Sequence, residues 1–171
     1  KRIAVDDKTG QAVALVDAEE KIQGKGFGSG HGAKHLFTLK TRDAAHPIMQ
    51  GLPAEWLHAN DELYGRMRGS ADHMHVLSSS FSKPEFGGTD MHEPMVWFAP
   101  FGKGRVVTTS MGHIMAADTS YDALHCVGFQ TILARSTEWA ATEKVTLAVP
   151  EGFPTLDKTS VIEPAKVNWK K

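Results

Sequence analysis

The residue type in this chain best suited to chemistry is histidine. Nine histidines occur among 171 residues, and two of them, His92 and His113, bound the segment HEPMVWFAPFGKGRVVTTSMGH. An imidazole can take up or release a proton near neutral pH, and Glu93 adds a carboxylate beside the first ring. A simpler interpretation makes His92 a turn residue and His113 a strand-end residue bonded to backbone. Because both rings fall at one strand end, we expect a site.

A β-hairpin has to bring these side chains together. Residues 95–99 and 105–110 are rich in β-branched or aromatic side chains, and residues 100–104 (PFGKG) have turn chemistry. If Ala99 pairs with Arg105, His92 lies opposite Gly112, and His113 is its diagonal neighbour. Directly opposed residues in such a pair are roughly 5 Å apart. Gly112 would let the chain turn at that point without a Cβ clash.

A glycine-rich stretch, residues 24–32 (GKGFGSGHG), leads into His31 and His35. It lacks the Lys-Ser/Thr ending of a phosphate-binding loop. The two histidines have a spacing that suits a metal site on a helix, but the glycines disfavour a helix here. We expect a loop whose backbone approaches a ligand with one histidine contributing, the alternative being a plain solvated loop.

Two acidic residues and one cysteine complete the candidates. Asp61 and Glu62 are adjacent, so in a strand they face opposite sides and at most one enters a given pocket. Either acid/base use of one or a solvated pair is compatible with this, and the same alternatives hold for His58. Cys126 lies within an expected helix and has no strained strand-to-helix elbow around it, which indicates a small core residue and not a nucleophile.

The composition limits the class of protein. Hydrophobic residues make up 41% of the chain, enough for the core of one domain, and the net charge is −1. That charge gives no indication of a nucleic-acid or anionic-membrane partner. A single cysteine excludes an internal disulfide and a cysteine-based zinc site. No apolar run reaches the length of a membrane span, and no signal peptide opens the sequence. A bacterial cytoplasmic and an exported location both fit.

The remaining pattern predicts the elements around the hairpin. Short apolar runs on both sides of Gly10 predict a peripheral hairpin within residues 1–20, and further strands are expected at 36–41, 76–81 and 144–149. An apolar helix over residues 121–141 should pack against the sheet. The residues from Pro150 onward read as a polar tail that wraps the domain or reaches a neighbour.

Three segments, 28–64, 92–113 and 127–158, together resemble the ThuA-like (trehalose utilisation) family. The resemblance implies an α/β fold of the class I glutamine amidotransferase-like superfamily, a flavodoxin-like three-layer sandwich with a mostly parallel sheet. On this basis residues 1–149 form the C-terminal portion of the domain, residues 1–24 are a connector or peripheral hairpin, and residues 150–171 are a tail.

The resemblance also implies that the N-terminal βα units of such a fold are absent from this chain. They would be supplied by a separate portion, by another chain or through a homo-oligomer. In the related amidotransferases a histidine after a late strand is followed two residues later by a glutamate. His113 has that position, but Met115 replaces the glutamate and the nucleophilic cysteine belongs to the absent half. Thiol-dependent amidotransfer is therefore not expected.

The function implied is the processing of a trehalose-related or oxidised sugar. His113 would be the general acid/base, and His92 and Glu93 would orient it or bind a metal. A divalent metal such as zinc on His31, His92 and His113 is a variant of this hypothesis. The competing hypothesis is a non-catalytic sugar-binding or assembly module. The substrate-binding residues expected are His31, His35, Trp56, Asp61 and Trp97.

Overall fold

The fold is built on one antiparallel sheet of seven strands. The computed structural model describes residues 1–15 and 29–169. The strands run in the order β2-β1-β8-β7-β4-β5, with β9 paired to β8. Their bounds are β1 Arg2–Val5, β2 Ala12–Leu15, β4 His35–Thr41, β5 Glu55–Asp61, β7 His75–Ser82, β8 Met91–Phe101 and β9 Gly104–Thr109. The strands predicted at 36–41 and 76–81, and the described part of the N-terminal hairpin, are confirmed.

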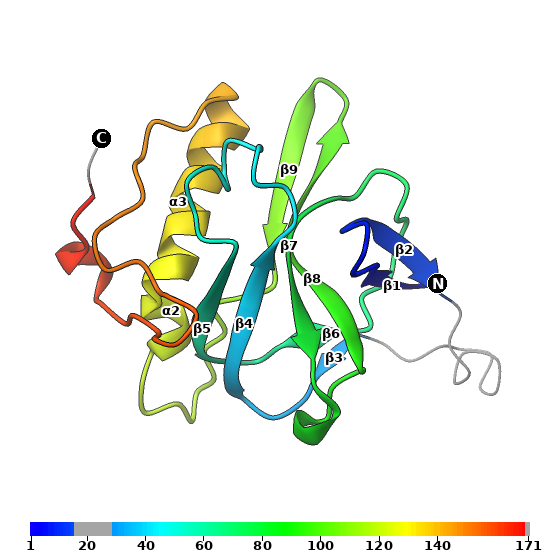
Figure 1. Ribbon diagram of the computed structural model, residues 1–171, viewed down its shortest axis with the longest axis horizontal. Coiled ribbons are helices and arrows are strands. Elements are labelled where there is room, and N and C mark those ends of the chain that lie inside the picture. The colour runs from blue at the N-terminus through cyan, green and yellow to red at the C-terminus, as the bar shows by residue number, and fades with distance from the viewer. Residues whose placement is uncertain (16–28, 170–171) are drawn as a thin grey trace.

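Smaller elements surround this sheet. A second, two-stranded sheet joins β3 (Gly30–His31) to β6 (Tyr64–Gly65). The helices are η1 (Pro84–Phe86), α2 (Asp122–His125), α3 (Val127–Thr142) and η2 (Pro164–Lys166). Figure 1 shows α3 beside the sheet on the side of β5, with β1 and β2 at the opposite end of the molecule. The mixed α/β class is as predicted, but the described strands pair only antiparallel, so they contain none of the parallel pairing that the resemblance implied.

The central hairpin forms, but its register differs by one residue from the prediction. Ala99 pairs with Val106, and Phe101 with Gly104, so that the turn holds only two residues. Gly102 adopts the left-handed conformation (φ 58°) that such a tight turn requires. Pro100 and Phe101, which we assigned to the turn, instead extend β8.

The two strands of the hairpin do not stay paired as far as His92 and Gly112. β9 ends at Thr109, opposite Val96, and the first part of β8 pairs with β1 through Val5 and His92. The predicted pairing of His92 with Gly112 is therefore wrong. A long strand can pair with different neighbours along its length, and here β1 takes the place that the continuation of β9 would have filled.

Helix α3 covers one face of the sheet and closes the core. Ile132 and Phe129 of this helix pack in one cluster with Trp56 of β5 and Met95 of β8. Gly128 makes the close approach possible, because a Cβ at this position would lie 2.2 Å from the Trp56 ring. Trp56 is fully buried beneath the helix.

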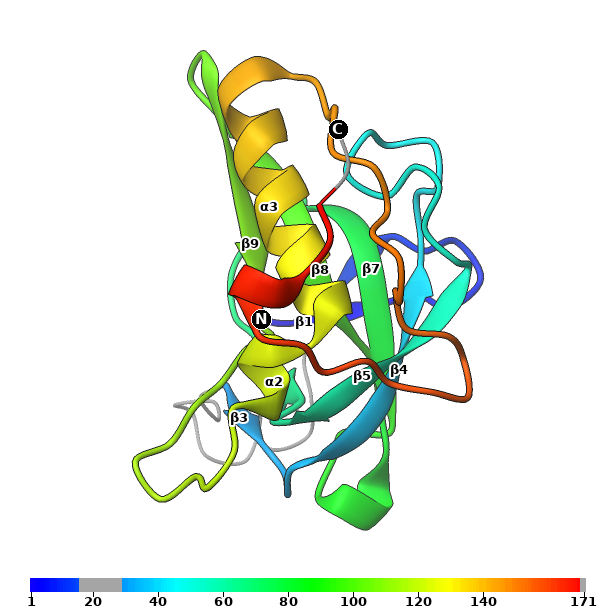
Figure 2. The same cartoon turned by 90° about the vertical axis from the view of Figure 1, so that its left-hand side faces the viewer.

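The predicted helix over 121–141 is broken at Cys126, which has an extended backbone (φ −61°, ψ 119°). The C-terminal segment bonds to this break: the Val127 amide donates to the Ser160 carbonyl, and the Ile162 amide donates to the His125 carbonyl. Figure 2 shows the segment running back across α2 and α3. The expectation that the tail wraps the domain is met by these contacts.

The strand predicted at 144–149 does not form. The Glu138 side chain accepts hydrogen bonds from the amides of Thr146 and Leu147, at 2.9 and 3.2 Å. Arg135 Nε donates to the Leu147 carbonyl at 3.0 Å. Side chains of α3 thus satisfy backbone groups that a neighbouring strand would otherwise have paired.

The Gly128 contact gives a stability prediction. Gly128→Ala should lower the free energy of unfolding by about 1–3 kcal/mol, because overpacking against Trp56 outweighs the ~1 kcal/mol helix-propensity gain. Chemical denaturation measures this difference. Gly30→Ala is the control, since a Cβ there meets no atom within 4 Å. Equal stability of the two variants would contradict the packing described.

Candidate functional site

The buried carboxylate of Asp61, at the end of β5, is the centre of the candidate site. One oxygen, Oδ2, accepts from His58 Nε2 at 2.9 Å and from the Gly112 amide at 2.7 Å. The other, Oδ1, accepts from His113 Nδ1 at 3.1 Å, from the His113 amide at 3.2 Å and from the Glu62 amide at 2.7 Å. The carboxylate thus links β5 to the loop that follows β9.

These hydrogen bonds keep Asp61 ionised. Burial opposes ionisation, but the bonds from His113, His58 and the Gly112 amide outweigh it and hold the pKa of Asp61 far below its usual value. Gly112 supports this arrangement by its conformation (φ 89°), and a Cβ there would lie 2.5 Å from the Phe129 ring. The turn role expected for Gly112 is therefore confirmed.

His113 is the member of this network that reaches a pocket. Its side chain is 29% exposed. Since an ionised carboxylate only accepts hydrogen bonds, the bond to Asp61 places a hydrogen on Nδ1. In the neutral form of the ring, the lone pair is then on Nε2. This is the state that a general base requires.

His58 lies on the inner side of the carboxylate and is fully buried. Burial lowers the pKa of His58, but the hydrogen bond to Asp61 and the interaction with the Cys126 side chain more than offset this and raise it to about 9. The same contact outweighs burial at Cys126 and lowers the pKa of that thiol. Cys126 is buried, as predicted for a core residue.

Tyr64 joins His113 to His31. The Tyr64 ring stacks on His113 with ring centroids 4.5 Å apart, and its centroid is 4.9 Å from that of His31. His31 Nε2 lies 3.5 Å from a carboxylate oxygen of Glu62. Burial and the nearby Glu62 charge raise the pKa of the Tyr64 hydroxyl. His31, which lies in β3, therefore contacts the Tyr64 ring that stacks on His113. Residues 24–28 of the glycine-rich stretch lie outside the described residues, and the ligand contact expected of this loop stays a prediction.

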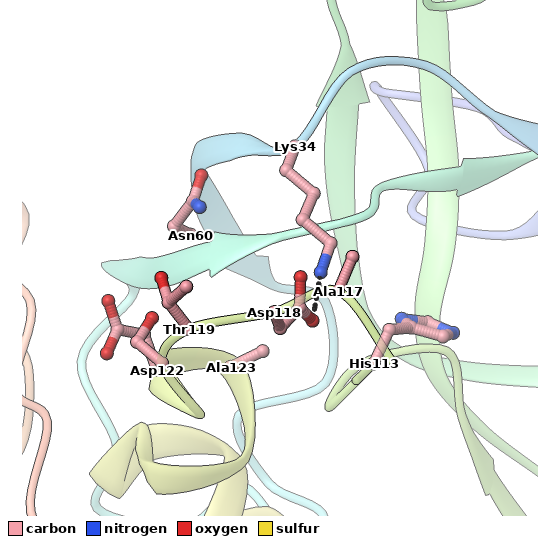
Figure 3. Close-up of a pocket in the computed structure, with 9 residues that line it drawn as sticks. Lys34, Asn60, His113, Ala117, Asp118, Thr119, Asp122 and Ala123 are labelled. Carbon is pink, nitrogen blue, oxygen red and sulfur yellow. Dashed lines mark hydrogen bonds and ion pairs between the residues drawn. The ribbon is translucent and has the colours of Figure 1, made fainter. Parts of the chain in front are cut away.

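A polar cavity of about 170 Å³ adjoins His113. Lys34 and Asp118 form an ion pair across it, with Nζ 2.5 Å from the carboxylate oxygen. Figure 3 shows the Lys34 side chain running to Asp118, with Asp122 on one side of the pair and His113 on the other. The other lining residues are Asn60, Ala117, Thr119, Ser120 and Ala123.

His92, predicted beside His113, lies elsewhere. Its Nε2 is 3.2 Å from Asp7, and its ring packs edge-on to Phe81. Burial lowers the pKa of His92. The shared site expected for the two rings is wrong in its geometry, because β1 pairs at His92 while the chain after β9 turns toward Asp61.

Glu93 is also separated from His113. It is fully buried, and its Oε1 accepts from Arg2 Nη2 at 2.8 Å and from Thr89 Oγ1 at 2.6 Å. Burial raises the pKa of Glu93 despite these contacts. Within the described residues, Glu93 therefore contacts Arg2 of β1 and lies close to Gly65 of β6 in the core, and it does not line the His113 pocket.

The structure also places the three other residues expected to bind substrate. His35 is buried, stacks on Phe86 with centroids 3.9 Å apart, and contacts the Ala33 carbonyl. Trp56 has no exposed surface, so stacking on a sugar ring is excluded in this conformation. Trp97 lines a different cavity of about 320 Å³, together with Met67 and Met74.

The three histidines expected to hold a metal do not converge. His92 is bonded to Asp7, and His31 and His113 lie on either side of Tyr64. Within residues 1–15 and 29–169, no group of three or more His, Cys, Asp or Glu side chains is arranged to hold a metal ion. No step of the chemistry below is therefore assigned to a metal.

The sequence pointed only weakly to the rest of the site. His58 and Asp61 are three residues apart in one strand, and a register shift in the β4–β5 pairing between them is needed before both can meet on one side. Lys34 and Asp118 come from loops of ordinary polar composition. The one available signal was the dense polar run of residues 58–64 at the end of an apolar strand.

The His58–Asp61 pair predicts a pH dependence of stability. The pKa of His58 is raised in the folded state, so protonated His58 stabilises the fold fully below about pH 6.5. This stabilisation is lost as the pH rises through about 9. The loss should be on the order of 3 kcal/mol. Thermal unfolding between pH 6 and 9.5 measures it, and His58→Phe should flatten this decline. Parallel curves for wild type and variant would contradict the pairing.

Comparisons with known proteins agree with this fold. The family model "Trehalose utilisation" (ThuA) matches residues 11–140. No curated protein matches the chain. The crystal structure of a ThuA-like protein from Parabacteroides merdae matches with a TM-score of 0.83 and 39% sequence identity, covering 94% of this chain. This chain spans 54% of that protein.

The structural match fits the predicted glutamine amidotransferase-like α/β fold. Among the described residues, no helix is both long and apolar enough to cross a bilayer. Because the family model covers most of the sequence and the same family describes the solved neighbour, the predicted resemblance is confirmed. The chain belongs to the ThuA-like trehalose utilisation family.

Proposed function

We propose that this chain contributes an acid/base site for processing a trehalose-related or oxidised sugar, with His113 as the catalytic base and acid. The observation that carries this proposal is the Asp61–His113 contact beside the polar cavity. A buried carboxylate that fixes the tautomer of a partly exposed imidazole is a common arrangement for proton transfer.

The chemistry follows from the orientation of the ring. Nδ1 donates to Asp61, and Nε2 can take a proton from a substrate hydroxyl, from a water molecule or from a carbon next to a carbonyl group. The same nitrogen can return the proton to a leaving group later in the reaction. Both hydrolysis and proton abstraction beside a carbonyl are compatible with this cycle. Asp61 is a positioning residue, because its side chain is fully buried and holds the His113 ring, whereas the substrate contact expected of Asp61 would need an exposed carboxylate.

The lining of the cavity suits a polyhydroxylated ligand. Asn60, Thr119, Ser120 and Asp122 offer hydrogen-bond donors and acceptors of the kind that sugar hydroxyls use. Lys34 adds a cation. After the Lys34–Asp118 ion pair breaks, the Lys34 ammonium can interact with a carbonyl or carboxylate oxygen of an oxidised sugar. His31 borders the same region through Tyr64.

The second candidate is a non-catalytic sugar-binding module, favoured by the same polar lining and by the small size of the cavity. The two candidates differ in what His113 contributes. In an enzyme it acts in the reaction step, and in a binding module it acts in affinity alone.

Replacement of His113 separates these candidates. His113→Ala should reduce kcat on an oxidised trehalose-type disaccharide by about 10²- to 10⁴-fold, since a general acid/base is lost, and should change ligand affinity much less. His75→Ala is the control, because His75 stacks on Phe98 outside the site. Steady-state kinetics and calorimetric titration measure the two effects.

Two results would contradict the catalytic proposal. Undiminished turnover in His113→Ala would remove His113 from the chemistry. Binding of the disaccharide without turnover in the wild-type protein would favour the binding module.

The metal-assisted variant remains a separate proposal with its own test. Elemental analysis of the purified protein, with His113→Ala and His92→Ala alongside, measures the bound metal. A stoichiometric metal that is lost in His113→Ala and kept in His92→Ala would support metal assistance at His113, because the two histidines do not converge. A metal-free, active wild-type protein would exclude it.

A further inference from the structure

We infer that Asp118 is a specificity-determining residue of the cavity beside His113: by holding Lys34 in an ion pair, it withholds the ammonium group from an acidic ligand, so that the cavity takes uncharged sugars in preference to sugar acids. This inference rests on the proposed function, which leaves open whether the ligand carries a carboxylate. It goes beyond that function because it assigns the choice between the two classes of sugar to one side chain.

The ion pair crosses the cavity that the ligand would occupy. Lys34 Nζ lies 2.5 Å from Asp118 Oδ2, although the two residues are 84 positions apart in the sequence. Figure 3 shows the Lys34 side chain ending at the Asp118 carboxylate. The Lys34 and Asp118 side chains are 22% and 21% exposed, so both reach the cavity surface. An acidic ligand in this cavity would have to take Lys34 away from Asp118.

The fold holds Asp118 in place for this contact. Its Oδ2 also accepts from the Met115 amide at 2.7 Å, and its own amide donates to the Met115 carbonyl at 3.0 Å. The bonds from Lys34 and from the Met115 amide hold the pKa of Asp118 below its usual value. A carboxylate that is already attached beside Lys34 acts at a high effective concentration, so the carboxylate of a free ligand competes poorly with it.

The loop that carries Lys34 is fixed as well. The Ala33 amide donates to the Phe86 carbonyl at 2.8 Å, and a Cβ on Gly32 would lie 1.7 Å from the same oxygen. The His35 ring stacks on the Phe86 ring with centroids 3.9 Å apart. Lys34 therefore extends from a backbone that is packed on both sides, and the ion pair joins two groups that are already in position.

The other charged groups near Lys34 are carboxylates. Asp122 lines the same cavity. The bond to Asp118, together with the charges of Glu62 and Asp61, raises the pKa of Lys34. In the part of the chain that the structure describes, a ligand carboxylate in this cavity would thus meet several negative charges and an ammonium group that is already paired. Repulsion of the wrong ligand is a common source of specificity, and a hydroxyl or carbonyl group does not meet it.

Acetate tests this arrangement without a sugar, because it presents the carboxylate alone. Asp118→Asn takes away the charged partner of Lys34 and keeps an oxygen that can accept from the Met115 amide. Acetate should bind this variant at least about ten-fold more tightly than the wild-type protein, since one negative charge is removed and Lys34 is freed. NMR titration, followed at the amides of the lining residues, measures both affinities. Equal affinities would overturn the inference.

Two further variants complete the comparison. Glu163→Gln is the matched control, because it also removes one carboxylate, here from a surface ion pair with Lys166 at 2.7 Å. It should leave the acetate affinity unchanged. Adding Lys34→Met to Asp118→Asn should abolish the gain. A gain that persists without Lys34 would overturn the inference, because the acetate would then bind elsewhere.

A measurement on the wild-type protein applies if Asp118→Asn does not fold. Acetate should bind the wild-type cavity with a Kd weaker than about 10 mM, as expected when Lys34 is engaged. Tighter binding at the lining residues would overturn the inference without any variant.

Glucose and glucuronate then test the choice of sugar, because glucuronate has a carboxylate where glucose has a hydroxymethyl group. In calorimetric titration the wild-type protein should prefer glucose by at least about ten-fold, and Asp118→Asn should reduce this preference. Equal binding of both sugars by the wild-type protein would overturn the inference. The expected acetate results in a protein that binds and processes no sugar would reject the proposed function and leave the exclusion of carboxylates by Asp118 intact. His113-dependent turnover with equal acetate affinities would do the reverse.

Discussion

The structure of the site depends on one constraint: an ionised carboxylate buried in the core must have all its hydrogen-bonding positions filled. Asp61 meets this constraint with two imidazoles and three backbone amides. Each partner comes from β5, from the residue after it or from the turn at residues 112–113. Satisfying the carboxylate therefore fixes the loop after β9 against β5, and this in turn places His113 at the cavity.

The rest of the fold supports that contact. Helix α3 presses on β5 through Gly128 and Trp56, and Phe129 packs against Gly112. The C-terminal segment bonds to the break at Cys126 and also to β5, where the Leu57 amide donates to the Thr155 carbonyl. The helix break, the tail and the loop of Gly112 thus meet around the same strand. A catalytic group held in this way needs little reorganisation before it accepts a proton.

The sequence predicted the central hairpin, most strands and the burial of Cys126, and the role of His113 stays a prediction. It failed where the outcome depended on contacts distant in the chain. The register changed because Gly102 and Lys103 alone form the turn, and His92 was drawn to β1 by a pairing that no local pattern indicates. The last strand was wrong because Glu138 and Arg135 bond its backbone. His58 joined the site through a register shift in the β4–β5 pairing between His58 and Asp61, and Tyr64 joined it from β6, which follows β5. Alternation along the strand predicted neither.

The family explains the fold, while the site is explained by charge and burial. The chain spans about half the length of the solved ThuA-like neighbour. What surrounds His113 in a protein of that full length is therefore proposed and not observed. The central claim is the protonation pattern of three side chains, which neutron diffraction near pH 7 measures directly. A hydrogen on Nε2 of His58, none on Asp61 and one on Nδ1 of His113 is the predicted result. A proton on Asp61, or a His113 that carries its hydrogen on Nε2, would contradict the account.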